Sequence, residues 1–394
     1  MINIPLAQRL LTQHSIDGWL LYDFRRSNPI VHRLLNLDPT AHYTRRFALW
    51  IPPMGEPTLL ISRIEAHLFE CLPFAKRYYV DRNQWYHTLK EFIGNSKRIA
   101  AEYSPFGQLP SVSFLDAGTA EYIRALGVEI ISSADLVQHL EAVWTEEQIK
   151  DNHTTAQLLR NIMLETIHYA ADLARNSKAT EYDIQQFILR AFSSHSLTTD
   201  HAPIVAVGVN TANPHYEPHP HNSESLHRNT LLLVDMWAKS SQPNATYADI
   251  TWVAWLGSSP PEIVRSICHI VIAARDAAIA LVSKRFTAEE PVYGYEVDDA
   301  ARNIITEAGY GEYFIHRTGH NIGTEVHGFG ANMDNFESQD TRRIIPGTSF
   351  SIEPGIYVPG QFGIRSECNI VIDHKGNVHI PSAPLQDDLI VCEV

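Results

Sequence analysis

One order of elements occurs twice in the C-terminal part of the chain, and this recurrence constrains the fold more than any other feature. A long helix is predicted from about residue 141, and a second one runs to about Phe192 after Thr180 and Asp183, which have the spacing of a capping box. Strands are then predicted over residues 202–209, 230–237 and 248–257.

The second occurrence begins at Ser259-Pro260-Pro261-Glu262, where prolines in the first turn predict the start of a helix that runs to about Lys284. A further helix is predicted over 296–308, ending at Gly309. Strands follow over 348–357 and 363–372. The repeated order predicts a pseudo-two-fold internal duplication with a cleft between its halves.

Residues 1–140 show a different pattern, in which short strand-like and helical pieces alternate. The expected strands are GWLLYDF, FALWIPP, PTLLISR, RIAAEYS and GVEIISS, each bounded by Gly, Pro, Asn or Ser. This predicts a smaller α/β domain over 1–140 and a larger domain over 141–394. No glycine-rich loop follows these strands, so we expect no nucleotide site there.

Composition excludes several classes of protein. Hydrophobic residues make up 44% of the 394 positions, which is enough to fill a core in each domain and excludes a disordered or fibrous chain. The formal charge of −14 has the wrong sign for binding nucleic acid or an anionic membrane. The pairs Arg25-Arg26, Arg45-Arg46 and Arg342-Arg343 are isolated in the sequence, and we interpret them as solvated or carboxylate-paired side chains.

The N-terminus lacks a basic leader with a long apolar stretch, and no run of about 18 uncharged apolar residues occurs. We therefore expect a cytoplasmic protein without a membrane span. The four cysteines are scattered without a CxxC pair, so we expect reduced, mostly buried thiols.

Carboxylates stand at unusual places in the predicted strands. Asp235 ends the apolar run LLLV, which is typical of a strand covered on both faces, and a buried unpaired charge is costly. Asp249 begins the next strand 14 residues later, so a hairpin can bring the two side chains together. In the second half, Glu353 and Glu367 are again 14 residues apart, and Arg365 shares a strand face with Glu367.

Four carboxylates that meet in a cleft repel one another unless cations lie among them. Two divalent metal ions would balance the charge. The imidazole for such a site is expected in HRTGHNIG, residues 316–323, where Gly319 and Gly323 allow a close approach of the backbone. Carboxylates with one imidazole suit Mn²⁺, Co²⁺, Fe²⁺ or Zn²⁺.

These pieces together resemble the pita-bread metallopeptidase family, which contains Xaa-Pro dipeptidase (prolidase), Xaa-Pro aminopeptidase and methionine aminopeptidase. The resemblance covers roughly residues 145–394, and residues 1–140 are similar to the smaller domain of prolidases and creatinase. The motifs that carry it occur in the family's order: APIVAVGVNTANPHY, LLLVDMW, DIT, HRTGHNIGTEVH, FSIEPGIY and FGIRSECNIVI.

The resemblance implies an α/β (α+β) chain with a pita-bread catalytic domain and a set of site residues. It implies that Asp235 binds one metal ion, that His320 and Glu353 bind a second, and that Asp249 and Glu367 bridge both. Mn²⁺ is the expected metal, with Co²⁺ and Zn²⁺ as alternatives. Glu353 is further expected to carry a proton in catalysis. Three histidines and an arginine are expected to contact the substrate or its tetrahedral intermediate: His215, His316, His327 and Arg365.

The sequence departs from the family pattern at several places near the site, among them a longer loop between the two aspartates and Tyr247 two rather than three residues before Asp249. Trp252 and Val253 follow Thr251, where an arginine is common, and Arg317 stands where glycine is usual. We expect these departures to alter contacts with the substrate and to leave the metal ligands intact.

The expected activity is hydrolysis of the peptide bond before proline, first in Xaa-Pro dipeptides and alternatively, as an aminopeptidase, in longer peptides. By resemblance the protein is expected to form a homodimer. A creatinase-like hydrolase without metal or a binding module of the same fold are the remaining alternatives; their lost ligand residues contrast with the complete set of five here.

Overall fold

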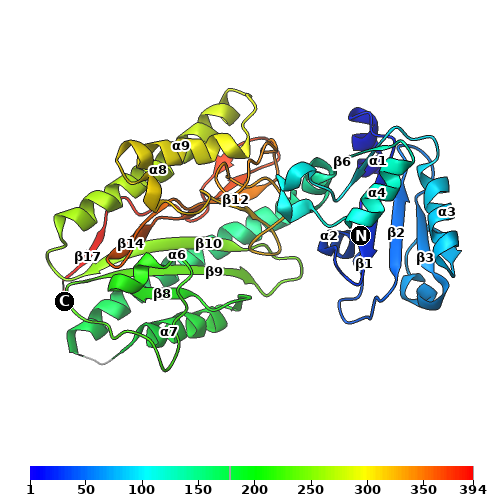
Figure 1. Cartoon of the computed structure of the whole chain (residues 1–394). Coiled ribbons are helices and arrows are strands. Elements are labelled where there is room, and N and C mark those ends of the chain that lie inside the picture. Colours follow the sequence, from blue (N-terminus) through cyan, green and yellow to red (C-terminus); the bar gives the residue numbers. More distant parts are fainter. Residues whose placement is uncertain (177–178, 394) are drawn as a thin grey trace. The chain divides into compact units, whose positions relative to one another are not determined.

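The computed structural model describes residues 1–176 and 179–393. The chain divides into two compact units, Met1–Glu141 (unit 1) and Ala142–Val394 (unit 2). Unit 1 contains a mixed sheet with helices, and unit 2 contains the long helices and the remaining sheets (Figure 1).

Unit 1 is built on a six-stranded sheet of order β4-β3-β2-β1-β5-β6. Its strands are β1 (Trp19–Phe24), β2 (Arg46–Ile51), β3 (Thr58–Ser62), β4 (Ala75–Tyr79), β5 (Arg98–Ala101) and β6 (Glu129–Ser132). Its α-helices are α1 (Ile4–Gln13), α2 (Pro29–Leu34), α3 (Arg82–Ile93), α4 (Ala117–Ala125) and α5 (Ala134–Val137). The five predicted strands are all present, whereas β4 was not predicted because its AKRYY sequence is mostly exposed and polar.

Unit 2 begins with two helices and a sheet: α6 (Glu146–Asn176), α7 (Glu181–Ser194), β7 (Leu197–Thr198), β8 (Ile204–Val207), β9 (Thr230–Ser240) and β10 (Ala248–Leu256). It continues with α8 (Glu262–Thr287), α9 (Gly294–Glu307), β11 (Asn321–Ile322), β12 (Ser349–Ile352), β13 (Gly355–Val358), β14 (Phe362–Arg365), β15 (Cys368–Ile372), β16 (Val378–His379) and β17 (Ile390–Cys392). The helix, helix, strands order therefore occurs twice, as predicted.

Both faces of the β9–β10 hairpin are covered, which explains its apolar sequence. Leu232 and Val234 pack on one face with residues of α6 and α7, whereas Leu231 and Leu233 pack on the other face with residues of α8 and α9. Side chains alternate between the faces of a strand, so Asp235 lies on the face turned toward α8 and the second half.

In the second half, two short ladders continue one hairpin. The β12–β15 ladder pairs Ile352 with Cys368, and the β13–β14 ladder pairs Gly355 with Arg365. Both ladders keep the same register, so Glu353 and Glu367 stand opposite each other in the gap between them. The predicted strands 348–357 and 363–372 are each divided at this gap.

Two predicted helix starts differ from the structure. The first long helix begins at Glu146 rather than near residue 141, because a short π-helical turn over 138–142 comes first. The helix expected to carry prolines in its first turn begins at Glu262, and Pro261 is its N-cap. The capping box of Thr180 and Asp183 is confirmed.

Helix α8 is long and apolar enough, by length and composition, to cross a membrane. In unit 2 it is a core helix, since residues such as Val271, Ala278 and Val282 are fully buried against the sheet residues. Its Arg275 is also buried and donates to Ser366 Oγ and to the carbonyl of Gln386, both at 2.8 Å. A buried, hydrogen-bonded arginine is typical of a soluble core rather than of a lipid-facing helix.

The two glycines of the histidine loop differ in what they allow. A Cβ on Gly319 would lie 1.9 Å from the carbonyl oxygen of Ser351 in β12, so only glycine permits this approach. A Cβ on Gly323 would meet nothing closer than 3.9 Å. Of these two glycines, only Gly319 is required for the close packing of the loop on β12, which places His320.

We predict that Gly319→Ala destabilises unit 2 by about 1–3 kcal/mol, because the loop must move off β12. Gly323→Ala is the matched control, and its expected effect is within about 0.5 kcal/mol. The measurement is the free energy of unfolding by urea for both variants. Equal effects of the two substitutions would show that the contact with Ser351 does not hold the loop.

Candidate metal centre

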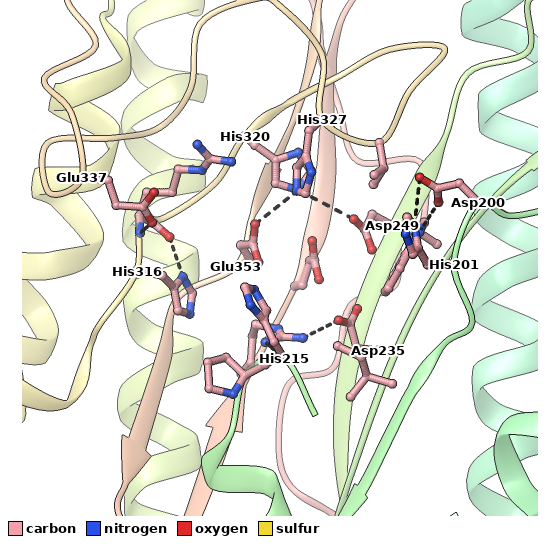
Figure 2. Close-up of a pocket in the computed structure, with 17 residues that line it drawn as sticks. Asp200, His201, His215, Asp235, Asp249, His316, His320, His327, Glu337 and Glu353 are labelled. Atoms are coloured by element: carbon pink, nitrogen blue, oxygen red, sulfur yellow. Dashed lines mark hydrogen bonds and ion pairs between the residues drawn. The ribbon is translucent and has the colours of Figure 1, made fainter. Parts of the chain in front are cut away.

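A pocket of about 360 Å³ in unit 2 contains all the residues that the sequence nominated for a site. Figure 2 shows labelled side chains from separate strands and loops pointing toward a common centre. The nine nominated residues that line it are Asp235, Asp249, His320, Glu353, Glu367, His215, His316, His327 and Arg365.

The β9–β10 ladder sets the positions of the two aspartates. Asp235 pairs with Thr251, and Asp249 pairs with Trp237, so the aspartates are diagonal neighbours on one face of the hairpin. The Cα atoms of such diagonal neighbours are about 7–8 Å apart across the two strands, so their side chains can meet when they point toward the same centre. The expectation that this hairpin brings the aspartates together is confirmed.

Asp235 is the carboxylate with a full set of protein partners. Arg365 Nη2 forms an ion pair with its Oδ2 (Figure 2), and the hydroxyl of Thr251 lies 2.9 Å from its Oδ1. The same hydroxyl lies 2.6 Å from Glu367 Oε2, and Arg365 Nε donates to it at 3.1 Å. Because a hydroxyl has one proton, Thr251 can donate to only one of the two carboxylates at a time.

His320 faces the opposite side of the cluster. Its Nε2 lies 3.4 Å from Glu353 Oε1 and 3.8 Å from Asp249 Oδ2 (Figure 2). Its backbone amide donates to Ser351 Oγ at 3.0 Å, which fixes the residue against β12. Ligand atoms of Asp249, His320 and Glu367 all lie within 4.8 Å of one another, a spacing that suits a single metal ion.

The unpaired oxygens of this cluster fit divalent cations. Asp249 Oδ1 and Glu367 Oε1 are buried and have no hydrogen-bond partner in the described structure. Burial first, and then the neighbouring carboxylates, raise the pKa of both Asp249 and Glu367 well above the usual range. Burial lowers the pKa of His320 to about 3, so its imidazole is neutral and available as a ligand. Without a cation these carboxyls favour the protonated form, and a bound divalent cation would favour the charged form that can act as a ligand.

His316 belongs to a separate hydrogen-bonded row beside the carboxylates. Its Nδ1 lies 2.7 Å from the carbonyl oxygen of Arg317, so Nδ1 carries the proton and Nε2 accepts from the hydroxyl of Tyr357 at 2.9 Å. Arg365 Nη1 donates to the same hydroxyl at 3.1 Å. Tyr357 was not nominated from the sequence, although it follows Glu353 in the FSIEPGIY motif.

His215 and His327 lie on the more open part of the pocket wall. Both side chains are exposed, and the ring of His327 packs edge-on against His320 with 4.3 Å between centroids. Loss of hydration against the surrounding protein, and then the positive charge of Arg317, lower the pKa of His327. Both rings are therefore placed to contact a molecule that enters the pocket.

Several pocket residues were not nominated from the sequence. Trp237 Nε1 donates to Asp200 Oδ1 at 2.8 Å, and His201 Nδ1 lies 3.3 Å from Asp200 Oδ2. Glu337 comes from the loop after the histidine motif and accepts from the amide of Arg317 at 3.2 Å. These residues belong to loops or strand ends without a pattern of their own; only Trp237, two residues after Asp235 on the same strand face, carried a usable signal.

The model of metallopeptidase family M24 matches residues 152–374. The chain is 27% identical over 357 residues to a probable dipeptidase PepE of Mycobacterium tuberculosis, covering 89% of this chain and 87% of that one. It is 37% identical over 184 residues to an Xaa-Pro dipeptidase of Lactobacillus delbrueckii, covering 44% and 43% of the two chains.

Among solved structures, the dipeptidase PepE from Mycobacterium ulcerans matches with a TM-score of 0.73 at 22% identity, covering 99% of this chain and 97% of that one. This likeness supports the two-part α/β architecture and the pita-bread fold. The matched family model spans more than half of the chain and all of the carboxylate cluster. The chain therefore belongs to metallopeptidase family M24.

Proposed function

We propose that this metallopeptidase hydrolyses the peptide bond before proline, with Xaa-Pro dipeptides as its preferred substrates. The observation that carries the proposal is the buried cluster of four carboxylates and one neutral imidazole, with two carboxylate oxygens left unpaired. The names of the relatives, dipeptidase and Xaa-Pro dipeptidase, support the substrate class.

In the proposed site, Asp235 binds one of two divalent cations, His320 and Glu353 bind the other, and Asp249 and Glu367 bridge them. The unpaired oxygens belong to Asp249 and Glu367, the two residues assigned to bridge. Manganese is the proposed metal, because oxygen ligands with one imidazole suit it, and Co²⁺ and Zn²⁺ fit the same donors. When bound, such cations activate water and polarise the scissile carbonyl.

The remaining steps belong to the chain's own residues. We propose that Glu353 takes a proton from the attacking water and delivers it to the leaving nitrogen of proline. The bond to proline is a tertiary amide without an N–H, so its hindered nitrogen needs a placed proton donor. His215, His316, His327 and Arg365 are proposed to contact the substrate or the tetrahedral intermediate, which their positions on the pocket wall support.

Arg317 supports dipeptides over longer peptides as substrates. It lines the pocket, and its guanidinium makes no hydrogen bond or ion pair with another residue in the described part of the chain. Arg365, the other arginine of this pocket, is already paired with Asp235. An uncommitted guanidinium next to the site can form a two-pronged bond with the free carboxylate of an Xaa-Pro dipeptide.

Further parts of the proposal concern the whole protein. We propose that unit 1 is the creatinase/prolidase-like domain, that the protein forms a homodimer, and that it acts in the cytoplasm. An Xaa-Pro aminopeptidase acting on longer peptides is the second candidate, since the fold and the carboxylate cluster fit it equally well.

We predict that Glu353→Gln lowers kcat by a factor of about 10³ or more, because the proton carrier and one ligand charge are both lost. Glu337→Gln is the matched control, since Glu337 lines the same pocket but is not a proposed ligand, and its rate should stay within a few-fold of wild type. Steady-state rates on an Xaa-Pro dipeptide measure both effects. Wild-type turnover in Glu353→Gln would remove this residue from the mechanism.

We predict that chelation abolishes turnover and that adding Mn²⁺ back to the apoprotein restores it. The assay compares Xaa-Pro dipeptides with Xaa-Pro-Xaa tripeptides, each with Mn²⁺, Co²⁺ and Zn²⁺. Dipeptides should have the higher kcat/KM. A preference for tripeptides supports the aminopeptidase instead, and unchanged turnover without metal contradicts the metal-dependent mechanism.

We predict that Arg317→Gln raises KM for an Xaa-Pro dipeptide by a factor of about 10 to 100, the size of one charge-assisted bond, with little change in KM for the corresponding Xaa-Pro amide. Arg317→Lys keeps the charge and should recover part of the loss. Equal losses on the acid and the amide would show that Arg317 does not bind the substrate carboxylate.

A further inference from the structure

Arginines that are far apart in the sequence line the same hollow in unit 1. Arg25 follows β1, Arg45 and Arg46 lie at the start of β2, and Arg82 begins α3. These four side chains line one open hollow of about 800 Å³, which we call the arginine hollow. Three separate segments of the chain thus bring four positive charges to one place.

None of these four arginines forms an ion pair with a carboxylate in the part of the chain that the structure describes. The guanidinium of Arg45 donates to the carbonyl and hydroxyl of Thr44, while its backbone amide donates to Glu65 Oε2, and the guanidinium of Arg46 lies over the ring of Trp85 at 4.9 Å. By contrast, Arg342 forms a buried ion pair with Asp340. The arginine pairs were interpreted as solvated or carboxylate-paired: the second alternative holds for Arg342, whereas the exposed Arg25 and Arg45 fit the first.

The two carboxylates on the hollow are committed to helix caps. Asp81 accepts from the amides of Asn83 and Gln84 at the start of α3, at 2.8 and 2.9 Å. Asp116 accepts from the amide and the hydroxyl of Thr119 at the start of α4, at 2.9 and 2.6 Å. Neither acid forms an ion pair with the arginines in the described structure, although Arg46 contributes to lowering the pKa of Asp116, so four positive charges face two negative charges.

The turn that carries Arg25 is strained and firmly held. Arg25 and Arg26 both have left-handed backbones, with φ of 58° and 64°, a conformation that costs non-glycine residues about 1 kcal/mol or more each. The buried Asp23 accepts from the amides of Arg26 and Asn28, at 3.0 and 2.9 Å. Strain of this kind persists where the surrounding structure fixes it, and it is common at binding sites.

We propose that the arginine hollow binds a small organic phosphate. Arginine forks match the oxygens of a phosphate group, and the exclusive use of arginine rather than lysine favours this two-pronged recognition. The hollow is larger than an inorganic phosphate and has the size of an organic ligand site. Phe24 and Val80, which are 43% and 67% exposed, also lie on it and provide an apolar surface for the organic part.

The charge distribution supports this location over a general attraction of anions to the protein. Unit 1 contains 14 Lys and Arg residues against 14 Asp and Glu residues, so the whole formal charge of −14 lies in residues 142–394. An anion therefore meets a neutral unit with a local concentration of positive charge. This proposal does not rest on the peptidase activity, and it concerns a site in a different unit.

The test is isothermal titration of the metal-loaded full chain with inorganic phosphate and with phenyl phosphate. Phenyl phosphate should bind several-fold more tightly than inorganic phosphate, because its ring can pack on Phe24 and Val80. Arg45→Gln and Arg82→Gln, both exposed side chains, should each weaken phenyl phosphate binding about tenfold. Arg63→Gln is the matched control: it removes an exposed arginine of unit 1 outside the hollow and should change binding less than twofold.

Four outcomes overturn the proposal. If Arg45→Gln and Arg82→Gln leave the affinity for phenyl phosphate unchanged, the ligand binds elsewhere, for example at the metal centre. Equal weakening by Arg63→Gln indicates a general charge effect. No saturable binding up to about 10 mM phenyl phosphate means that the hollow is not such a site. Tighter binding of an acidic peptide than of phenyl phosphate, lost in the same variants, identifies a protein partner instead. Circular dichroism of each variant checks that unit 1 is folded.

Discussion

The cost of holding four carboxylates together in a buried pocket is the constraint on which the rest of unit 2 depends. A carboxylate loses much of its hydration when buried, and neighbouring negative charges add to the cost. The loss of hydration and the repulsion between carboxylates are offset differently on the two sides of the cluster. Asp235 has Arg365 as a direct counter-charge, whereas Asp249 and Glu367 each keep one buried oxygen without a partner. Arg365 therefore offsets part of the cost on the first side, whereas on the second side a proton or a bound cation has to do so.

The architecture around the cluster follows from that requirement. The β9–β10 hairpin is covered on both faces, so its aspartates are shielded from water and screened little by salt. The β12–β15 and β13–β14 ladders are interrupted at Glu353 and Glu367, whose backbone amides donate instead to the carbonyls of Thr318 and Thr251. Gly319 then lets the histidine loop approach β12 closely enough for His320 to complete the set. Together these features bring four carboxylates and one imidazole to one buried place.

Much of this site could be predicted because it depends on short-range rules. Two-residue alternation and strand register decide the face of Asp235, Asp249, Glu353 and Glu367, and both can be inferred from the sequence. The position of the uncommitted Arg317 guanidinium on the pocket wall could not be predicted, because it depends on how a loop without periodicity packs. The same is true of Asp200, which reaches the pocket from a loop and binds Trp237. Strand β4 was missed because an exposed edge strand lacks the apolar alternation that marks a buried one.

The arginine hollow also could not be predicted from the sequence. Composition gave a strongly acidic chain, and no local run of basic residues predicted a positive site. The order of strands in the sheet brings basic residues together. β1 and β2 are neighbouring strands, and α3 begins shortly after β4, which lies two strands from β2. Residues 25, 45 and 82 therefore meet although no window of the sequence contains them all. Net charge is a property of the whole chain, but a ligand responds to the charges within about one Debye length, roughly 8–10 Å, of where it binds. A chain with an overall charge of −14 can thus attract cations in one unit and bind an anion in the other.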